Sequence, residues 1–384
     1  MAVANGHASY MPPQRLRKFE NDLEAIPLWL ATGNDMILTR NSVDTEFTDT
    51  LSRRGIALPR FIQKTSQFDK KNISELHPWG WSPAAHKHLE AFKAQCSQGW
   101  NEHHMSTWKD THKELLSRLT GLKLSETAQA NTTTEYNLLE IPANPLKISS
   151  PDQFHDIQNS IPFPILLKAP WSASGRGLFK IGSPDTKAFT NLHLLGKLKQ
   201  QGFLMAEPFL EKIHDVSFHF WSSNKGIHYL GYSFFKTDPT GQFLACYLNT
   251  PKLEELKNYP LSESLEQAKH LLKISLQKMK IDNSYHGPIG IDGLFFRNSE
   301  KAIKLQPCIE INLRYTMGLL NIKLREKLQH QGGGFWQIVN IKRAEWDKLA
   351  NEKSTMSNGE SICREILPLT PPPKQSGYMA CLKI

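Results

Sequence analysis

Acidic and amide side chains interrupt two apolar strands in the last third of the chain. The strand at residues 290–296 carries Asp292, and the strand at residues 308–314 carries Glu310, Asn312 and Arg314. Side chains alternate between the two faces of a strand, so the last three residues share one face. An unpaired carboxylate in apolar surroundings is strongly destabilising. Oxygen ligands of this kind suit Mg²⁺ or Mn²⁺, which complete their shells with water and phosphate oxygens. The two strands therefore predict a metal–nucleotide site.

A lysine and a Ser/Gly loop lie upstream of these strands. Lys168 is part of the apolar strand 165–169, where a buried ammonium group needs an anionic partner. The loop that follows offers hydroxyl and backbone N–H groups with little bulk, as in a phosphate cradle that closes over a nucleotide. The residue order of a Walker loop is absent. A plain turn is the alternative interpretation of this Ser/Gly stretch. The candidate loop residues are Ser172, Ser174, Gly175, Arg176 and Gly177.

A further acidic segment follows the apolar strand 203–207. Extended backbone at Phe209 and Leu210 could pair with a purine edge, while a carboxylate such as Asp215 accepts ribose hydroxyl groups. A solvated acidic turn between two strands is an equally good interpretation of Glu207 and its neighbours.

The order of these motifs resembles that of the ATP-grasp superfamily of carboxylate–amine ligases, over about residues 107–320. The resemblance implies ATP and two Mg²⁺ (or Mn²⁺) ions as cofactors. It implies metal ligation by Asp292, Glu310 and Asn312, with Glu310 bridging the two ions. It places Lys168 at the α- and β-phosphates, residues 172–177 in the lid loop, Glu207, Phe209 and Leu210 at the adenine hinge, and Asp215 at the ribose. Arg314 corresponds to the arginine that holds the transferred phosphoryl group or the acyl-phosphate.

Other basic residues have less defined roles in this resemblance. Lys109 is similar to a nucleotide-contacting lysine of the family, and a solvated helix residue is the alternative. Relatives often place an arginine just before the first metal aspartate, whereas residues 288–290 are neutral here. Arg176 or Lys236 would then supply that charge, with Lys236 at the γ-phosphate. Pro208 replaces the second acid of the usual hinge pair, and its nitrogen cannot donate a hydrogen bond.

The implied reaction is ATP-dependent formation of an amide or peptide bond. A substrate carboxylate attacks the γ-phosphate, and a substrate amine then displaces phosphate from the acyl-phosphate. Two alternatives stay open: an ATP-grasp-like kinase that phosphorylates a small hydroxyl substrate, and a non-catalytic Mg-ATP-binding protein. The sequence does not identify the carboxylate or the amine.

The pattern of elements predicts an α/β protein whose catalytic part is α+β. A strand–turn–strand at 26–39, a helix at 44–54 and a strand at 59–63 indicate an open parallel sheet in a preceding domain. Helices are expected at residues 83–95, at 107–119, where Gly121 would end the helix, and at 262–280, the last with a clear apolar stripe. The predicted divisions are a disordered lead-in (1–14), an N-terminal α/β domain (15–125), a small ATP-grasp subdomain (126–210) and a large one (211–384).

Composition indicates a soluble cytoplasmic protein. The chain has 384 residues, 39% of them hydrophobic, and a net charge of +9 without any dense Lys/Arg run, which disfavours nucleic acid as a partner. Its five scattered cysteines form no C-x-x-C pair and fit a reducing compartment. No segment approaches the roughly 20 apolar residues of a membrane span. Small carboxylate and amine substrates are the expected partners, and a homodimer stays open.

One motif is outside this scheme. His77-Pro78-Trp79-Gly80-Trp81 places two tryptophans around a glycine at a loop-to-helix junction. Aromatic walls of this kind could receive an acceptor substrate. An aromatic plug between domains is the alternative, because tryptophan is highly buried on average.

Overall fold

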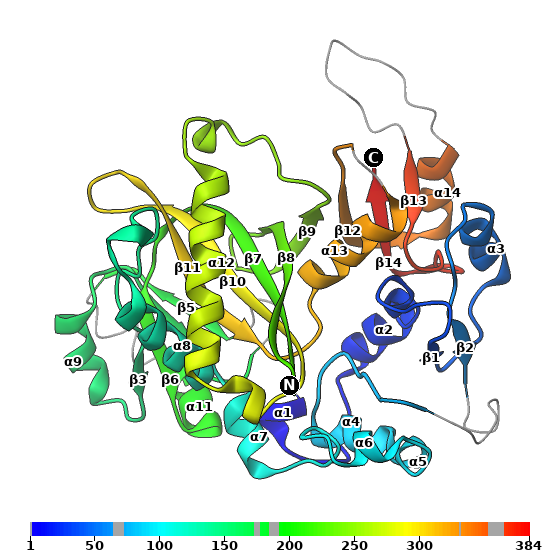
Figure 1. Cartoon of the computed structure of the whole chain (residues 1–384), viewed down its shortest axis with the longest axis horizontal. Coiled ribbons are helices and arrows are strands. Elements are labelled where there is room, and N and C mark those ends of the chain that lie inside the picture. Colours follow the sequence, from blue (N-terminus) through cyan, green and yellow to red (C-terminus); the bar gives the residue numbers. More distant parts are fainter. Residues whose placement is uncertain (1, 64–72, 173–176, 184–191, 330–331, 352–364) are drawn as a thin grey trace.

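The computed structural model describes residues 2–63, 73–172, 177–183, 192–329, 332–351 and 365–384. The part that was predicted to be catalytic contains two antiparallel sheets, which confirms the predicted α+β class (Figure 1). The large sheet has the strand order β11-β10-β7-β8-β9-β12-β14-β13. Its strands are β7 (Glu211–Ser223), β8 (Gly226–Thr237), β9 (Phe243–Tyr247), β10 (Gly287–Arg297), β11 (Ile303–Asn312), β12 (Phe335–Lys342), β13 (Ile366–Pro368) and β14 (Ser376–Lys383).

The small sheet precedes the large one in the sequence and has the strand order β3-β6-β4-β5. It consists of β3 (Leu146–Ile148), β4 (Ile165–Lys168), β5 (Leu178–Ile181) and β6 (Leu204–Pro208), with helices α9 (Gln153–Ser160) and α11 (Leu192–Gln201). Phe154 and Ile157 of α9 and Leu194 and Leu198 of α11 pack with the inner strand residues into a separate core. The sheet and its helices therefore form a unit with a hydrophobic core of its own.

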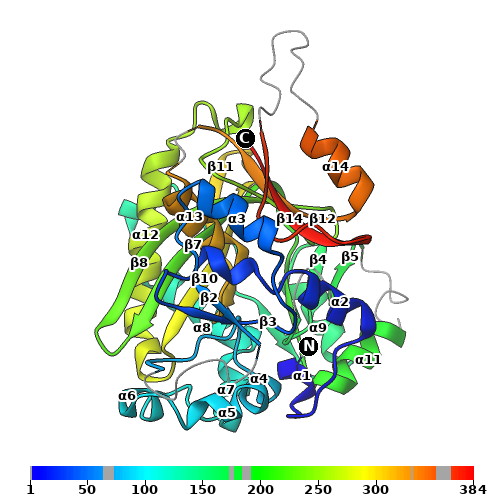
Figure 2. The same cartoon turned by 90° about the vertical axis from the view of Figure 1, so that its right-hand side faces the viewer.

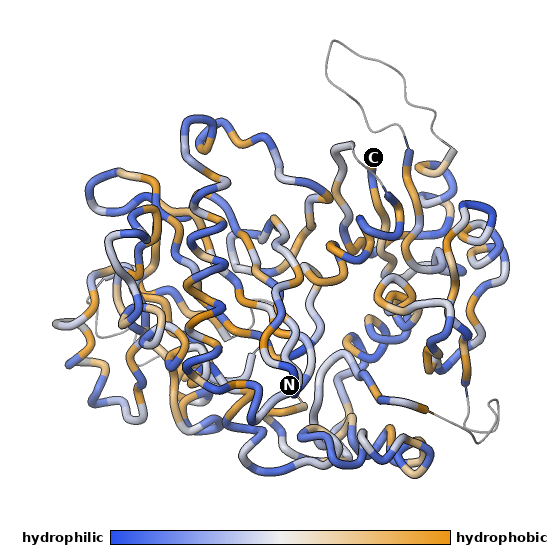
Figure 3. The backbone as a smooth tube through the Cα atoms, viewed as in Figure 1, coloured by the Kyte–Doolittle hydropathy of each residue, from blue (hydrophilic) through white to orange (hydrophobic). Residues whose placement is uncertain are grey.

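Helices α12 (Leu261–Lys278) and α13 (Met317–Leu328) cover opposite faces of the large sheet. Leu265, Ala268, Leu271, Leu272 and Leu276 of α12 are buried against Val216, Phe218 and Ile291, which confirms the predicted apolar stripe. Hydrophobic and hydrophilic residues alternate along this helix in Figure 3. Leu320 and Leu324 of α13 pack instead with Cys246 and Trp336 on the other face. Ser217 and His219 of β7 lie on the α13 face, close to Gly318.

The N-terminal segment contains the predicted β-α-β unit in small form. Strands β1 (Met36–Leu38) and β2 (Arg60–Ile62) pair in parallel, and α3 (Thr45–Arg53) connects them, with Asp44 as its N-cap. Residues 26–29 form the 3₁₀ helix η1 (Ile26–Trp29) rather than the expected strand, because Pro27 lies at its first turn. The Trp29 indole N–H donates to the carbonyl oxygen of Leu369 at 2.7 Å. This unit and α2 (Gln14–Asp22) therefore lie beside the C-terminal strands (Figures 1 and 2).

The region between the N-terminal β-α-β unit and the small sheet differs most from the prediction. The expected helix at 83–95 is two helices, α4 (Pro83–His88) and α5 (Glu90–Lys93), and the one at 107–119 ends early, as α7 (Asp110–Leu115). A new helix, α8 (Arg118–Asn131), begins after the N-cap Ser117 and crosses the predicted boundary at residue 125. Gly121 does not stop it, because this glycine lies inside α8, close to Ile311 of β11. The structure also contains helix α1 (Ala2–Asn5) within the stretch that was expected to be disordered.

The remaining elements are short. They are α6 (Gln98–Asn101), η3 (Thr134–Tyr136), η4 (Glu254–Leu256), η5 (Ile281–Asn283) and α14 (Arg343–Asn351). None of the helices in the described ranges has both the length and the hydropathy that a membrane span requires.

A buried stack of indole and imidazole rings lies at the start of α4. The His86 ring stacks on Trp81 at 4.5 Å between centroids and lies 6.0 Å from Trp108. His86 is 5% exposed, and neither of its ring nitrogens has a hydrogen-bond partner. Burial, followed by the charge of Lys93, lowers the pKa of His86 from 6.5 to about 4. The folded protein therefore holds this imidazole neutral.

His86 is expected to make stability depend on pH. Below pH 6.5 the His86 side chain binds a proton in the unfolded chain, but in the folded protein it does so only near pH 4. The contribution of neutral His86 to the free energy of unfolding is therefore complete above pH 6.5 and is lost on acidification. The free energy of unfolding of the wild type should fall about 2 kcal/mol further between pH 7 and pH 5 than that of a His86→Phe variant. Urea titrations at both pH values measure this difference. An exposed histidine of the same helix, changed as His88→Phe, is the control, and equal losses in all three proteins would contradict the prediction.

Candidate active site

Two acidic residues face each other on adjacent strands of the large sheet. Asp292 of β10 pairs in register with Glu310 of β11 and, on its other side, with Ser217 of β7. The next row along the same face consists of His219, Gly290 and Asn312. The Asn312 side-chain nitrogen donates to Asp292 Oδ2 at 3.1 Å. The structure thus brings together the three residues that the sequence suggested as metal ligands.

The two carboxylates differ in how their charge is balanced. Burial, and then the neighbouring Glu310, raise the pKa of Asp292 to about 7. Burial also favours a higher pKa for Glu310, but Arg118, Lys168 and Arg314 outweigh it and leave that pKa lowered. Glu310 is therefore compensated by three cations, whereas Arg314 compensates the charge of Asp292 only in part.

This donor set fits a divalent cation. Two carboxylates and an amide oxygen are hard ligands, and Asp292 is a partly buried acid whose charge lacks a full counter-charge. No cluster of three or more His, Cys, Asp or Glu side chains suited to a metal occurs in the ranges that the structure describes. The three oxygen-bearing side chains would fill only part of the octahedral shell of a magnesium ion, which usually keeps water and phosphate oxygens as further ligands.

Arg118, at the first position of α8, connects the acidic row to the small sheet. One guanidinium nitrogen lies 3.0 Å from Glu310 Oε2. The others donate to the carbonyl oxygen of Ala169 at 3.0 Å and to Ser172 Oγ at 3.1 Å. The side chain is 11% exposed. Arg118 was not among the predicted site residues, because the helix expected at 107–119 put it near a helix end, although Ser117 before it is a helix-start signal.

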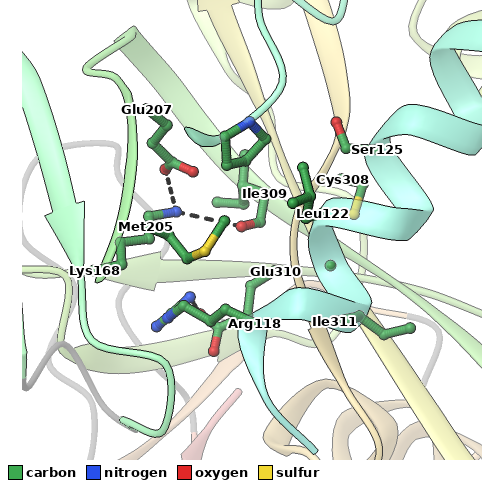
Figure 4. A pocket seen from close by; sticks show the side chains of 12 residues that line it. Arg118, Leu122, Ser125, Lys168, Met205, Glu207, Cys308, Ile309, Glu310 and Ile311 are labelled. Carbon is green, nitrogen blue, oxygen red and sulfur yellow. Dashed lines mark hydrogen bonds and ion pairs between the residues drawn. The ribbon is translucent and has the colours of Figure 1, made fainter. Parts of the chain in front are cut away.

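Lys168 and Glu207 form an ion pair between neighbouring strands β4 and β6 (Figure 4). The lysine also donates to the carbonyl oxygen of Ile309, on the edge strand β11, at 3.3 Å. Both side chains line a cavity of about 20 Å³ between the two sheets and α8. Arg118, Met205, Cys308 and Glu310 line the same cavity. Lys168 is thus directed at the acidic strand β11, and Glu207 balances its charge.

The loop after Lys168 is closed at its base. The Ala169 N–H donates to the carbonyl oxygen of Gly177 at 2.9 Å, and Ser172 lies beside Arg118. Gly177 has φ +81°, and a Cβ atom there would come within 3.0 Å of Ala169 Cβ, so this position requires glycine. Ser174, Gly175 and Arg176 lie outside the described residues.

The predicted hinge is altered at one position. The backbone N–H of Phe209 already donates to the carbonyl oxygen of Pro164 at 2.8 Å, so it is not free for a purine. Phe209 is 40% exposed, and the centroid of its ring lies 3.7 Å from Lys180 Nζ. Leu210 follows it between β6 and β7. Asp215, at the start of β7, is buried and accepts from Lys212 at 2.8 Å and Thr237 at 2.9 Å.

Two predicted lysines lie away from this site. Lys109 is exposed, immediately before α7, and does not line the cavity. Lys236 follows Phe235, which pairs with Asp215, so alternation places Lys236 on the α12 face with Phe234. The acidic row lies on the opposite face. Neither lysine lies in the site. Arg118 instead provides the positive charge that was expected there.

Arg314 lies in the turn between β11 and α13, two residues beyond Asn312. Its positive charge lowers the pKa of both Asp292 and Glu310. Thr316 caps α13 by accepting from the Leu319 N–H, and a Cβ atom on Gly290 would lie 2.7 Å from Thr316 Cγ2. The start of α13 is therefore fitted closely to the sheet beside Asn312.

No model of a protein family matches the sequence, and no curated protein is similar to it. Among solved structures, N5-carboxyaminoimidazole synthetase from Staphylococcus aureus is 12% identical, with a TM-score of 0.49 over 94% of this chain and 90% of that one. The biotin carboxylase domain of Hydrogenobacter thermophilus 2-oxoglutarate carboxylase, in complex with MgADP, ADP and bicarbonate, is 15% identical, with a TM-score of 0.44 over 91% and 75%. At such values these likenesses identify neither a reaction nor a substrate for this chain.

Proposed function

We propose that this chain is an ATP-grasp enzyme that joins a small carboxylate to a small amine through an acyl-phosphate. The convergence of Asp292, Glu310 and Asn312 with Arg118 and Lys168 at the meeting of two sheets supports it most directly. These residues come from four separate elements, and acids with bases of this kind are what a Mg-nucleotide requires. The order of motifs along the chain supports the same proposal.

Each residue has a role in this proposal. Asp292, Glu310 and Asn312 would hold Mg²⁺, which when bound neutralises phosphate charge. Lys168 and Arg118 would bind the phosphate oxygens, and Asp215 the ribose. Arg314 would hold the carboxylate substrate while one of its oxygens attacks the γ-phosphorus and ADP leaves. Attack of a neutral amine on the carbonyl carbon then releases phosphate.

Nucleotide binding requires a rearrangement of the cavity. A volume of about 20 Å³ accommodates little more than one water molecule. The Lys168 ammonium group, which would bind phosphate oxygens, is engaged by Glu207 and by the carbonyl oxygen of Ile309. We therefore expect the small sheet to move away from β11 when ATP enters, and to close again over the bound nucleotide.

Release of ADP tests the proposed activity. Purified protein with Mg-ATP should release ADP when supplied with the right pair from a set of amino acids, peptides, small carboxylates and amines. The mass of the product separates the alternatives: an amide with phosphate for a ligase, a stable phosphoester for a kinase. Raised melting temperature with Mg-ATP but no ADP from any pair would indicate the non-catalytic protein, and no response to ATP would contradict all three.

A further inference from the structure

An aromatic cluster lies beside Arg314 and has no part in the proposed phosphoryl transfer. It consists of His77, Trp79, Trp221 and Tyr315. Ring centroids lie 5.9 Å apart for His77 and Trp221, 6.2 Å for Trp79 and Tyr315, and 6.5 Å for Trp221 and Tyr315. All four side chains are partly exposed, His77 by 41%. The rings are thus in contact with each other but keep surface for a ligand.

The strand register places this cluster in line with the acidic row. Trp221 follows His219, and His219 follows Ser217, on the same face of β7, opposite Pro288, Gly290 and Asp292 respectively. Each step of two residues advances about 6.6 Å, so Trp221 lies about 13 Å along the sheet from the row of Asp292. Arg314 lies beyond Asn312 in the same direction. The cluster is therefore on the side of the site away from Asp215.

The loop that carries Trp79 is held directly over Arg314. The Tyr315 N–H donates to the carbonyl oxygen of Trp79 at 2.9 Å. A Cβ atom on Gly80 would lie 3.3 Å from Arg314 Cβ, so the loop backbone passes against the arginine side chain. Any substrate held by Arg314 would therefore lie next to these rings.

Two acidic residues, Glu75 and Asp35, lie near the cluster. Glu75 Oε2 lies 3.0 Å from His77 Nε2 and is 51% exposed. Burial, and then the charges of Asp35 and Glu75, raise the pKa of Tyr315 to about 12, so both carboxylates act at this ring. Negative charge next to aromatic faces is the combination that attracts organic cations.

We propose that the aromatic cluster, with Glu75 and Asp35, binds a protonated amino group of the acceptor substrate, which is a diamine-type compound. This inference rests on the proposed function, which makes the region beside Arg314 the site of the acceptor substrate. The distal ammonium group stays charged against the rings. The other amino group, in its neutral form, attacks the acyl carbon near Arg314, forming the C–N bond as the C–O bond to phosphate breaks. The phosphate leaves with that electron pair, and the nitrogen loses a proton to solvent.

Binding of choline tests the cluster without ATP or turnover. Calorimetry should show choline binding about 10-fold more tightly than its neutral isostere 3,3-dimethylbutan-1-ol. Trp79→Leu should remove most of that preference, whereas Phe335→Leu, a partly exposed ring on the distant strand β12, should leave it unchanged. Glu75→Gln, at an exposed position, should weaken choline several-fold but not the alcohol, and serves if Trp79→Leu does not fold. Equal affinities for the two probes would overturn the proposal.

A second measurement separates this inference from the proposed function. Among amine substrates, 1,4-diaminobutane should support ADP release at least 10-fold faster than 1-aminobutane. If choline binds but no amine supports ADP release, the ligase proposal fails and the cation site stands. If both amines support ADP release equally and choline binds no more tightly than its neutral isostere, the ligase proposal stands and the cation site fails.

Discussion

Replacing Asp292 by asparagine is expected to abolish ADP release and, at the same time, to stabilise the protein in metal-free buffer. The carboxylate is a partly buried acid opposite Glu310, and its charge is only partly compensated. An asparagine oxygen can still accept from Asn312, so the change removes charge without removing that hydrogen bond. The expected gain in the free energy of unfolding is about 1–2 kcal/mol, measured in urea with EDTA. An unchanged rate of ADP release would remove Asp292 from the site.

Glu310→Gln is the matched comparison, with the opposite effect on stability. It should also abolish ADP release, but it leaves Arg118 buried without its carboxylate and should cost about 1–3 kcal/mol. Asp49→Asn, an exposed position on α3, should alter neither quantity. If Asp292→Asn and Glu310→Gln shift stability in the same direction, the unequal charge balance described for the two carboxylates is incorrect.

Arg118→Gln is expected to reduce ADP release at saturating ATP by about 100-fold. The variant loses the ion pair to Glu310 and both donors to the loop that follows Lys168. Arg118→Lys keeps a positive charge at Glu310 but cannot also bond Ala169 and Ser172, so its rate should be intermediate. Rates of the three proteins, with the melting temperature of each, measure the effect.

Lys123→Gln provides the control for Arg118. Lys123 lies on the same helix, is 65% exposed and is 4.0 Å from Glu114, so its removal should change neither rate nor stability. A wild-type rate in Arg118→Gln would show that the contact with Glu310 serves only to join the two sheets.

The parts of the site that lie on regular strands could be predicted from the sequence. Asp292, Glu310 and Asn312 follow strand alternation on two adjacent strands, and both the local pattern and the order of motifs indicated them. The stripe of α12 was equally readable, because five buried residues recur with helical spacing. In both cases local sequence and tertiary packing demand the same arrangement.

The failures involve contacts that no local pattern encodes. Arg118 reaches the acidic row only because α8 packs across β11, and Gly121, which looked like a helix end, lies inside α8 near Ile311. Lys236 is one position out of phase with Asp215, which depends on the pairing of β7 with β8. The Phe209 N–H donates to the carbonyl oxygen of Pro164, which lies 45 positions earlier in the chain. Register and long-range hydrogen bonds decide such cases.

The bond between the Trp29 indole and Leu369 has a consequence for synthesis of the chain. Its partners are 340 positions apart, and the core around Trp29 includes Trp336, Leu367 and Leu382. A ribosome that has made the first half of the protein has not yet made the surface that buries Leu28 and Trp29. Domains usually fold in order as they emerge, but this N-terminal unit must wait for the last strands. Until then its apolar residues are available to chaperones or to other nascent chains.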